Sequence, residues 1–218
     1  MPRSLQFLHC LGRRSGVALI SALCITAGLN GTAISQTTSP VVRFSGTVVS
    51  ATPTTLIVKT RGGEVVDLAF AEKLVVSEVV PIRLEDIQPG SYIGTAAIPQ
   101  PDGTQRAIAV SVFPETSRGS NEGHRPFDLI AQSTMTNATV SDVGAMANTP
   151  SGRVLRLKYK DGEKTVVVPP EVPVTTSRPG DRSLLVPGAS VSVFAQEVAG
   201  KPTALRLNAG RNGFVLPY

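Results

Sequence analysis

An internal repeat is the feature that most constrains what this chain can fold into. The segment GTVVSATPTTLIVKTRGGEVVDLAF, which begins at Gly46, is similar to ATVSDVGAMANTPSGRVLRLKYKDGEKTVVV, which begins at Ala138. The similarity continues in later blocks, and the corresponding residues are almost evenly spaced. Four corresponding pairs are Leu56 and Leu155, Glu64 and Glu163, Pro89 and Pro187, and Ala107 and Ala204, separated by 99, 99, 98 and 97 residues. This nearly constant spacing predicts two copies of one structural unit.

Each copy is expected to consist of short strands. Apolar residues alternate with polar ones, or run together, over segments bounded by Gly, Pro and Asp, which is typical of β-strands. The segments PIRLEDIQPG and GDRSLLVPG have room for at most one helical turn. The order in each copy is three strands, the turn and two strands, as in an OB-type barrel. The expected strands span 42–50, 55–60, 64–70, 91–98 and 105–113 in the first copy, and include 153–160, 163–169, 190–197 and 203–208 in the second.

Composition agrees with an all-β fold. The chain contains 20 Gly and 17 Pro and no Trp, which suits short strands joined by tight turns better than long helices. We therefore expect two tandem, small OB-like five-stranded barrels, each with a short helical turn between strands 3 and 4. The expected organisation is a signal peptide at 1–35, a short lead at 36–40, a first barrel at 41–115, a linker at 116–133, a second barrel at 134–210 and a tail at 211–218.

Residues 1–35 differ from the rest of the chain. They carry three arginines and no acid, followed by the apolar run VALISALCITAGL. This run of 13 residues is too short to cross a bilayer core, which needs about 20. Together with the small residues of AIS, it predicts a secretory signal peptide cleaved between Ser35 and Gln36, with cleavage after Ala33 as the alternative. The mature protein is then periplasmic or extracellular.

Other modes of export and anchoring are less well supported. Arg13 and Arg14 form a twin-arginine pair, but GRRSGVAL lacks the remaining features of that signal, so the general secretory route is favoured. A lipoprotein signal needs a small residue before its cysteine, whereas Leu23 precedes Cys24. An uncleaved signal would leave the same domain outside the membrane. No second apolar segment follows, so we expect no transmembrane span in the mature chain.

Removal of the signal changes what charge and cysteine content imply. The whole chain has a formal charge of +5, and loss of the three arginines leaves +2. A charge this small disfavours nucleic acid as the partner. Cys10 and Cys24 are lost with the signal, so the mature chain has no disulfide, thiol nucleophile or thiolate metal site.

Six segments of the mature chain stand out together: GEVVDLA, IQPGSYIGTAAIPQPDGT, GHRPFDL, TMTNATV, LKYKDGEKTVVVPP and PGDRSLLVPGASVSVFAQ. With these segments the chain resembles exported bacterial proteins of unknown function that are built from two tandem OB-like repeats. The segments cover most of the mature chain, and none is a catalytic motif. The resemblance therefore implies a fold and export, but no activity. The single short apolar segment argues against the permease names that some similar sequences carry.

A basic strand is the first candidate binding site. In RVLRLKYKDGEK, period-two alternation places Arg156, Lys158 and Lys160 on one strand face. Such a face suits a polyanion, such as an anionic polysaccharide or lipid phosphates. The favoured alternative is a solvated face whose lysines discourage edge pairing. The aromatic residues of single-strand binders are missing there except Tyr159, which is expected on the opposite face.

The segment RGSNEGHRPFDL in the expected linker is the second candidate. Its polar cluster consists of Glu122, His124, Arg125 and Asp128, and His124 is the only histidine of the mature chain. The cluster could hold a divalent ion, or His124 could act as a general base, but metal and catalytic sites usually need more such residues. The favoured interpretation is structural: these side chains fix an ordered linker whose apolar residues pack against a barrel.

The sequence contains no constellation of residues typical of an enzyme. We therefore expect a non-enzymatic, exported envelope protein, a binding or structural module, with no catalytic residues, cofactor or metal. Its expected partner is an envelope macromolecule. One alternative is a polyanion or oligosaccharide binder that uses the basic face of the second barrel. The other is a metal-binding protein that uses the linker cluster around His124.

Overall fold

The fold is built almost entirely from β-strands. The computed structural model describes residues 39–146 and 149–218; the expected signal peptide and its cleavage site at Ser35 and Gln36 lie outside them. The strands are β1 (Val42–Ala51), β2 (Thr55–Thr60), β3 (Val65–Pro81), β4 (Tyr92–Pro99), β5 (Gln105–Val112), β6 (Gly123–Pro126), β7 (Thr134–Met146), β8 (Thr149–Tyr159), β9 (Gly162–Val168), β10 (Val174–Pro179), β11 (Ser190–Val198) and β12 (Lys201–Gly210). Three 3-10 turns are η1 (Leu84–Asp86), η2 (Glu115–Ser117) and η3 (Arg182–Leu184). The all-β class is thus confirmed.

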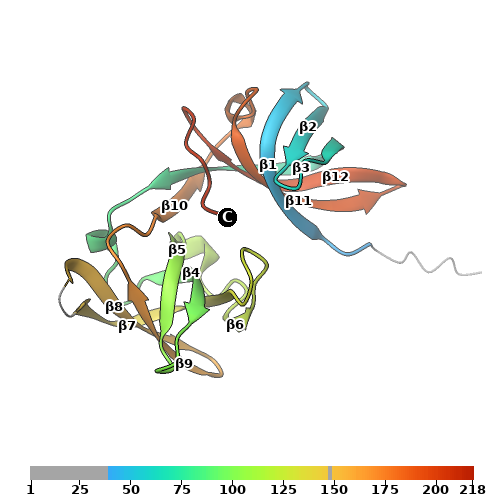
Figure 1. Ribbon diagram of the computed structural model, residues 1–218. Coiled ribbons are helices and arrows are strands. Elements are labelled where there is room, and N and C mark those ends of the chain that lie inside the picture. Colours follow the sequence, from blue (N-terminus) through green and yellow to red (C-terminus); the bar gives the residue numbers. More distant parts are fainter. Residues whose placement is uncertain (1–38, 147–148) are drawn as a thin grey trace, which may run out of the picture. The chain divides into compact units, whose positions relative to one another are not determined.

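Five strands close into a mixed barrel in the order β1, β2, β3, β12, β11 and back to β1 (Figure 1). The pairing between β3 and β12 is parallel, and the other four are antiparallel. The alternate residues of each strand that face inward form the core. Its fully buried members include Leu56, Val58, Leu68, Val193 and Leu207.

Beyond the barrel the same sheet continues through β10, which pairs with β3 and β5, and then runs in the order β5, β4, β7, β8 and β9. The first and last strands of this run, β5 and β9, meet in a short parallel pairing, and β6 pairs with β7. The core of this part contains Ile93, Val110, Leu155, Leu157 and Val166. The helical turns η1 and η3 contribute Leu84 and Leu184 to the two cores.

The strand pairing differs from the tandem arrangement that the repeat predicts. The closed barrel combines β1, β2 and β3 with the last two strands of the chain, whereas β4 and β5 pair with β7 and β9. The pairings therefore run across the expected bounds 41–115 and 134–210. The cause lies in β3 and β10, which pair antiparallel with each other. Because they run in opposite directions, the chain that leaves β3 continues into β4, which pairs with β7, and the chain that leaves β10 continues into β11, which pairs with β1.

The register of these pairings follows the spacing seen in the sequence. Val79 of β3 lies opposite Ser177 of β10, which is 98 residues later. Several pairings on one side of this crossing have a counterpart on the other. Val76 pairs with Leu207 as Val174 pairs with Val110. Ile93 pairs with Ala138 as Val191 pairs with Gly46. Ile93 also pairs with Val112 as Val191 pairs with Ala209. The first three strands of each expected copy thus pair with the last two strands of the other.

A buried carboxylate lies where β3 and β10 cross. The Glu78 side chain is 5% exposed, and its Oε1 accepts hydrogen bonds from Arg211 Nε at 2.9 Å and Arg178 Nη2 at 3.0 Å. The hydrogen bonds from Arg211 and then Arg178 lower the pKa of Glu78 from 4.5 to about 2. At Gly180, a Cβ atom would lie 2.9 Å from the Glu78 backbone nitrogen, so the close approach requires glycine.

None of the helical turns in residues 39–146 and 149–218 has the length or apolar character of a membrane-spanning helix.

Candidate functional site

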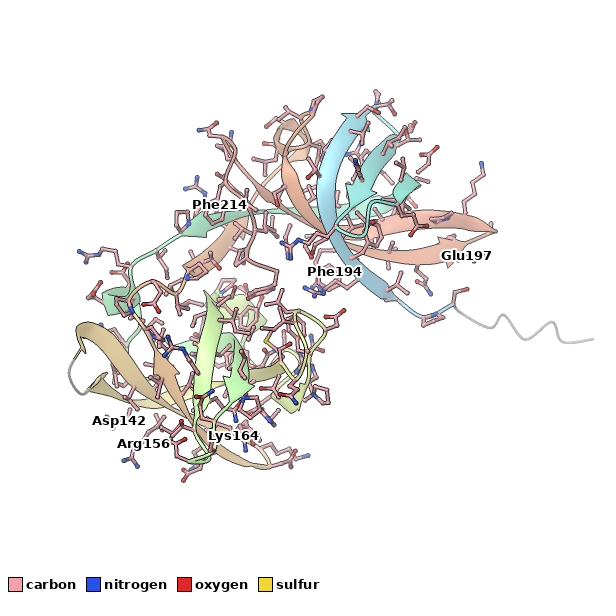
Figure 2. All side chains as sticks on the ribbon, in the orientation of Figure 1. Asp142, Arg156, Lys164, Phe194, Glu197 and Phe214 are labelled. Atoms are coloured by element: carbon pink, nitrogen blue, oxygen red, sulfur yellow. The ribbon has the colours of Figure 1, made fainter. Side chains whose placement is uncertain are left out.

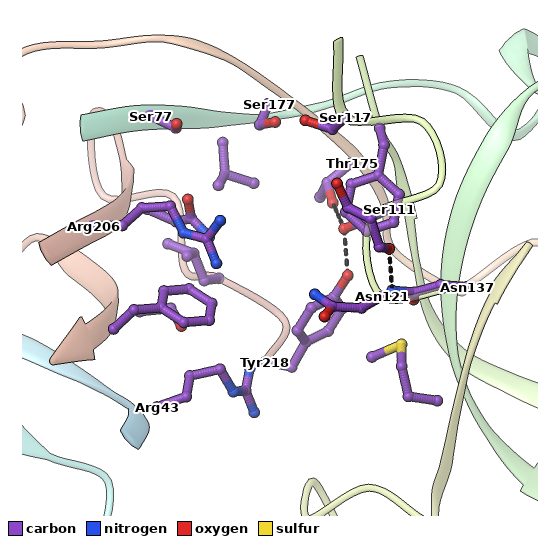
Figure 3. A pocket seen from close by; sticks show the side chains of 18 of the residues that line it. Arg43, Ser77, Ser111, Ser117, Asn121, Asn137, Thr175, Ser177, Arg206 and Tyr218 are labelled. Atoms are coloured by element: carbon purple, nitrogen blue, oxygen red, sulfur yellow. Dashed lines mark hydrogen bonds between the residues drawn. The ribbon is translucent and has the colours of Figure 1, made fainter. Parts of the chain in front are cut away.

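A cavity with a volume of about 520 Å³ is lined by residues from the closed barrel, from the strands beyond it and from the tail (Figure 3). This volume lies within the range of small-molecule sites, about 300–1,000 Å³. Its walls come from β1, β3, β11 and β12 of the closed barrel, from β5, β7 and β10, and from the segment that contains β6. Strands distant in the sequence therefore build one site, which we call the central pocket.

The central pocket is cationic. Arg43, Arg125 and Arg206 line it, and no lining residue is Asp or Glu. The Arg206 Cζ atom lies 4.0 Å from the centroid of the Phe194 ring, and the Arg43 Cζ atom lies 4.8 Å from that of Phe127. Stacking on an aromatic ring leaves the edge of a guanidinium group free to donate hydrogen bonds.

These arginines are only weakly neutralised by the protein. Arg43 Nη2 lies 3.3 Å from Oδ1 of Asp128, but the Asp128 side chain is 78% exposed, so solvent screens the pair. Arg125 donates to the backbone carbonyl of Asn121 at 3.0 Å. Within the described ranges, Arg206 forms no ion pair. Positive charge in the pocket is thus available to a ligand.

Two buried polar atoms in the lining have no partner among the described residues. They are Oδ1 of Asn137 and Oγ of Ser192, in residues that are 4% and 2% exposed. The Asn137 Nδ2 donates to the Ser120 carbonyl at 3.2 Å, which orients the amide and leaves Oδ1 as an unused acceptor. An unpaired buried polar group costs about 1–3 kcal/mol.

The tail forms one wall of the central pocket. Arg61 Nη2 donates to the Leu216 carbonyl at 2.7 Å, and the Leu216 N–H donates to Ser190 Oγ at 3.1 Å. The Tyr218 hydroxyl is hydrogen-bonded to Ser111 Oγ, as Figure 3 shows. Burial raises the pKa of Tyr218 above its usual value, so the phenol is neutral at physiological pH. The tail therefore fixes the wall without adding a phenolate to the pocket.

No family model, no curated protein and no solved structure matches the chain.

The basic strand predicted as a polyanion site lies in β8. Leu155 and Leu157 are fully buried, and Arg156 and Lys158 are exposed on the other face, as the alternation predicts. Arg156 Nε lies 3.7 Å from Asp142 Oδ2, and both side chains are exposed (Figure 2). Lys158 is opposite Glu163 in the pairing with β9. Carboxylates therefore alternate with these cations, and Lys160 lies beyond the strand in the β8–β9 turn.

Three residues of the linker cluster, Glu122, His124 and Arg125, lie together, whereas Asp128 lies apart from them. His124 Nδ1 lies 2.8 Å from Thr136 Oγ1, and partial burial and then Lys164 lower the pKa of His124. Asp128 pairs with Arg43, and Glu122 is exposed. A second, smaller depression is lined by Glu122, His124, Arg125 and Asp161, among others. In the part of the chain with described coordinates, no group of three His, Cys, Asp or Glu residues is placed to hold a metal ion.

Of the predicted site residues with described positions, only Arg125 lines the central pocket. No pattern in the sequence groups Arg43, Arg206, Asn137 and Ser192. They lie on β1, β12, β7 and β11, and only the exchange of strands between copies brings them to one cavity. The apolar segment of the linker was the one useful indication, because its Phe127 supports Arg43 and packs edge-on against Tyr218 with ring centroids 6.0 Å apart.

Proposed function

We propose that this protein is a non-enzymatic, exported binding module whose central pocket takes an anionic ligand. The observation that carries the proposal is the set of three lining arginines without a carboxylate side chain in the lining. Arginine suits this role because its planar group can donate two parallel hydrogen bonds to a carboxylate or phosphate. The localisation remains periplasmic or extracellular, and it is supported by the signal peptide expected at 1–35.

The strand order supports a binding module of the OB type. The order β1, β2, β3, β12, β11, with β3 and β12 parallel, corresponds to the order of strands in an OB barrel. We extend this assignment to the sheet of β7, β8, β9, β5 and β4, which has the equivalent pairings. OB barrels commonly bind oligosaccharides or oligonucleotides on their surface and loops. The resemblance to exported two-repeat proteins agrees with this assignment.

The two alternatives from the sequence receive less support. The basic face of Arg156, Lys158 and Lys160 alternates with Asp142 and Glu163. A polyanion would therefore meet both signs of charge on this face. The metal-binding alternative would need His124, Glu122 and Asp128 to converge, but Asp128 is paired with Arg43 instead.

Thermal unfolding in the presence of different ions tests the proposal. A ligand that binds only the folded state raises the unfolding midpoint. At constant ionic strength, we expect phosphate and citrate to raise the midpoint of the wild-type protein more than that of the double variant Arg43→Gln, Arg206→Gln. General salting effects of these ions act on both proteins and cancel in the comparison.

The control is the double variant Arg156→Gln, Lys158→Gln, which removes exposed charge from β8 and leaves the pocket intact. We expect it to respond like the wild type. Spermidine, a cation, should give no pocket-dependent shift. Equal anion shifts in the wild type and the pocket variant, or loss of the shift in the β8 variant, would contradict the proposal.

A further inference from the structure

One wall of the central pocket carries two arginines in a single cross-strand row. Arg43 of β1 lies directly opposite Phe194 of β11, and Phe194 lies directly opposite Arg206 of β12. Directly opposite residues of neighbouring strands share one face of the sheet. The adjacent residues Val193 and Leu207 belong to the barrel core, so the row faces outward, into the pocket.

The two guanidinium groups are held at separate points of this wall. Strands β1 and β12 lie on either side of β11, so the Cα atoms of Arg43 and Arg206 are about 9–10 Å apart, two strand spacings. Arg206 lies over the Phe194 ring, whereas Arg43 lies over the ring of Phe127, which follows β6. Figure 3 shows both side chains extending from this wall toward Tyr218. Each arginine therefore presents its own donors to the pocket.

A ligand with a single negative charge does not balance this pair of cations. Asp128 lies 3.3 Å from Arg43, but its side chain is 78% exposed, so solvent screens the pair. No residue of the lining is Asp or Glu. Two anionic groups on one ligand match both arginines, and the link between the groups makes the second contact intramolecular, which strengthens binding.

Four hydroxyl groups in the lining are already hydrogen-bonded within the protein. The hydroxyls of Ser111 and Thr175 are bonded to each other at 3.0 Å, and the Tyr218 hydroxyl is bonded to Ser111. The Thr176 hydroxyl donates to the Val112 carbonyl at 2.8 Å. Apolar side chains supply much of the remaining surface, among them Val75, Val79, Phe113, Met135 and Leu216. The part of the ligand between its anionic groups can therefore be apolar.

We propose that the central pocket binds a dicarboxylate, a ligand whose two carboxylates are joined by an apolar spacer. One carboxylate pairs with Arg43 and the other with Arg206, each through the parallel hydrogen bonds that a planar guanidinium group can donate. Two carboxylates balance two guanidinium groups, whereas two phosphate monoesters carry about three to four negative charges at pH 7. This inference rests on the proposed function, because both need an anion in the pocket. It adds the second anionic group and the spacer as requirements.

Isothermal titration calorimetry on the purified protein, at constant ionic strength, tests the inference. The probes are the dicarboxylates succinate, adipate and suberate, and the monocarboxylates of equal chain length, butyrate, hexanoate and octanoate. Each pair keeps the chain length and differs in the second carboxylate. We expect the tightest dicarboxylate to bind at least ten times more tightly than its monocarboxylate, since a hydrogen-bonded contact between charged groups contributes about tenfold or more.

Single variants separate the two ends of the ligand. Arg43→Gln and Arg206→Gln each remove one guanidinium group and keep the other. We expect each variant to bind the tightest dicarboxylate about tenfold more weakly than the wild type does, close to the affinity of the monocarboxylate. The matched control is Arg106→Gln. Arg106 is exposed on β5, pairs with the exposed Glu171 and does not line the pocket, so this variant should bind like the wild type.

The possible failures are distinguishable. Equal affinities of each dicarboxylate and its monocarboxylate, or weakened dicarboxylate binding in only one of the two arginine variants, would overturn the dicarboxylate inference and leave the proposed anion site in place. Binding of none of the carboxylates, with a phosphate-induced thermal shift that still depends on Arg43 and Arg206, would have the same meaning. Absence of both the binding and the shift would overturn the inference together with the proposed function.

Discussion

Arginine has two different surroundings in this molecule. At the crossing of β3 and β10, Arg178 and Arg211 both donate to the buried carboxylate of Glu78. In the central pocket, Arg43 and Arg206 instead lie over aromatic rings and have no carboxylate in the lining. In the first cluster the positive charges are paired with Glu78 within the fold. In the second cluster they remain available to a ligand.

The difference separates a structural role from a binding role. A buried carboxylate that receives hydrogen bonds from two guanidinium groups contributes to folding and offers nothing to a ligand. A pocket whose arginines have no carboxylate in the lining contributes little to folding. Changes at the crossing should therefore affect stability, and changes in the pocket should affect affinity.

The largest expected effect comes from Glu78→Gln. This variant keeps the size of the side chain but removes the charge that pairs with Arg178 and Arg211, at the point where the two copies cross. We expect a fall of several degrees in the unfolding midpoint, measured by circular dichroism. Glu197→Gln, at an exposed position of β11, is the control and should unfold like the wild type. Identical midpoints for the two variants would show that the ion pairs of Glu78 do not stabilise the folded protein.

The acid dependence of stability should have the same origin. The pKa of Glu78 is about 2 in the folded protein and 4.5 when unperturbed, so its contribution is complete above pH 4.5. Because protonation favours the unfolded state here, this contribution is lost as the pH falls from 4.5 towards 2. Denaturant titrations across this range should show a smaller loss of stability in Glu78→Gln than in the wild type. Parallel pH profiles would rule Glu78 out as the cause.

A smaller effect is expected from Gly210→Ala, which disturbs the tail. A Cβ atom at this position would lie 2.0 Å from the carbonyl oxygen of Phe214, so the tail that carries Tyr218 must move. We expect a loss of about 1–3 kcal/mol in the free energy of unfolding, and weaker anion binding because one pocket wall is displaced. Gly62→Ala meets only the Thr60 hydroxyl at 3.7 Å and is the control. Unchanged anion affinity in Gly210→Ala would exclude the tail from the site.

The smallest effect on stability is expected from Arg206→Gln. The side chain is exposed and loses only its contact with the Phe194 ring, which is worth less than about 1 kcal/mol. Chemical denaturation should therefore give nearly the wild-type free energy of unfolding. A destabilisation as large as that of Glu78→Gln would mean that Arg206 has a structural role and would remove the contrast between the two clusters.

The sequence predicted the strands and their buried faces well, but it did not predict which strands pair with each other. In β8, Leu155 and Leu157 alternate with Arg156 and Lys158, and this pattern identifies the buried face correctly. Alternation does not specify which strand lies alongside, so a repeat is compatible with pairing within a copy or between copies. The antiparallel pairing centred on Val79 and Ser177 decides the matter, and no local pattern encodes it.

The sequence predicted neither of the two arginine clusters, and the reasons are related. Glu78 lies in SEVV, where an acidic residue is normally exposed, and its burial depends on Arg178 and Arg211 from distant segments. Arg43 and Arg206 lie near opposite ends of the described chain and meet only because β1 and β12 belong to one barrel. Both sites therefore depend on the exchange of strands that the sequence did not reveal.

The most direct test of the central claim is an NMR titration of the protein with suberate and then with inorganic phosphate. If anions bind in the central pocket, we expect the backbone amide signals of Asn137, Ser192 and Arg206 to shift and saturate together with at least one of these ligands. Shifts confined to Arg156 and Lys158 on β8, with no change at the pocket residues, would contradict this account.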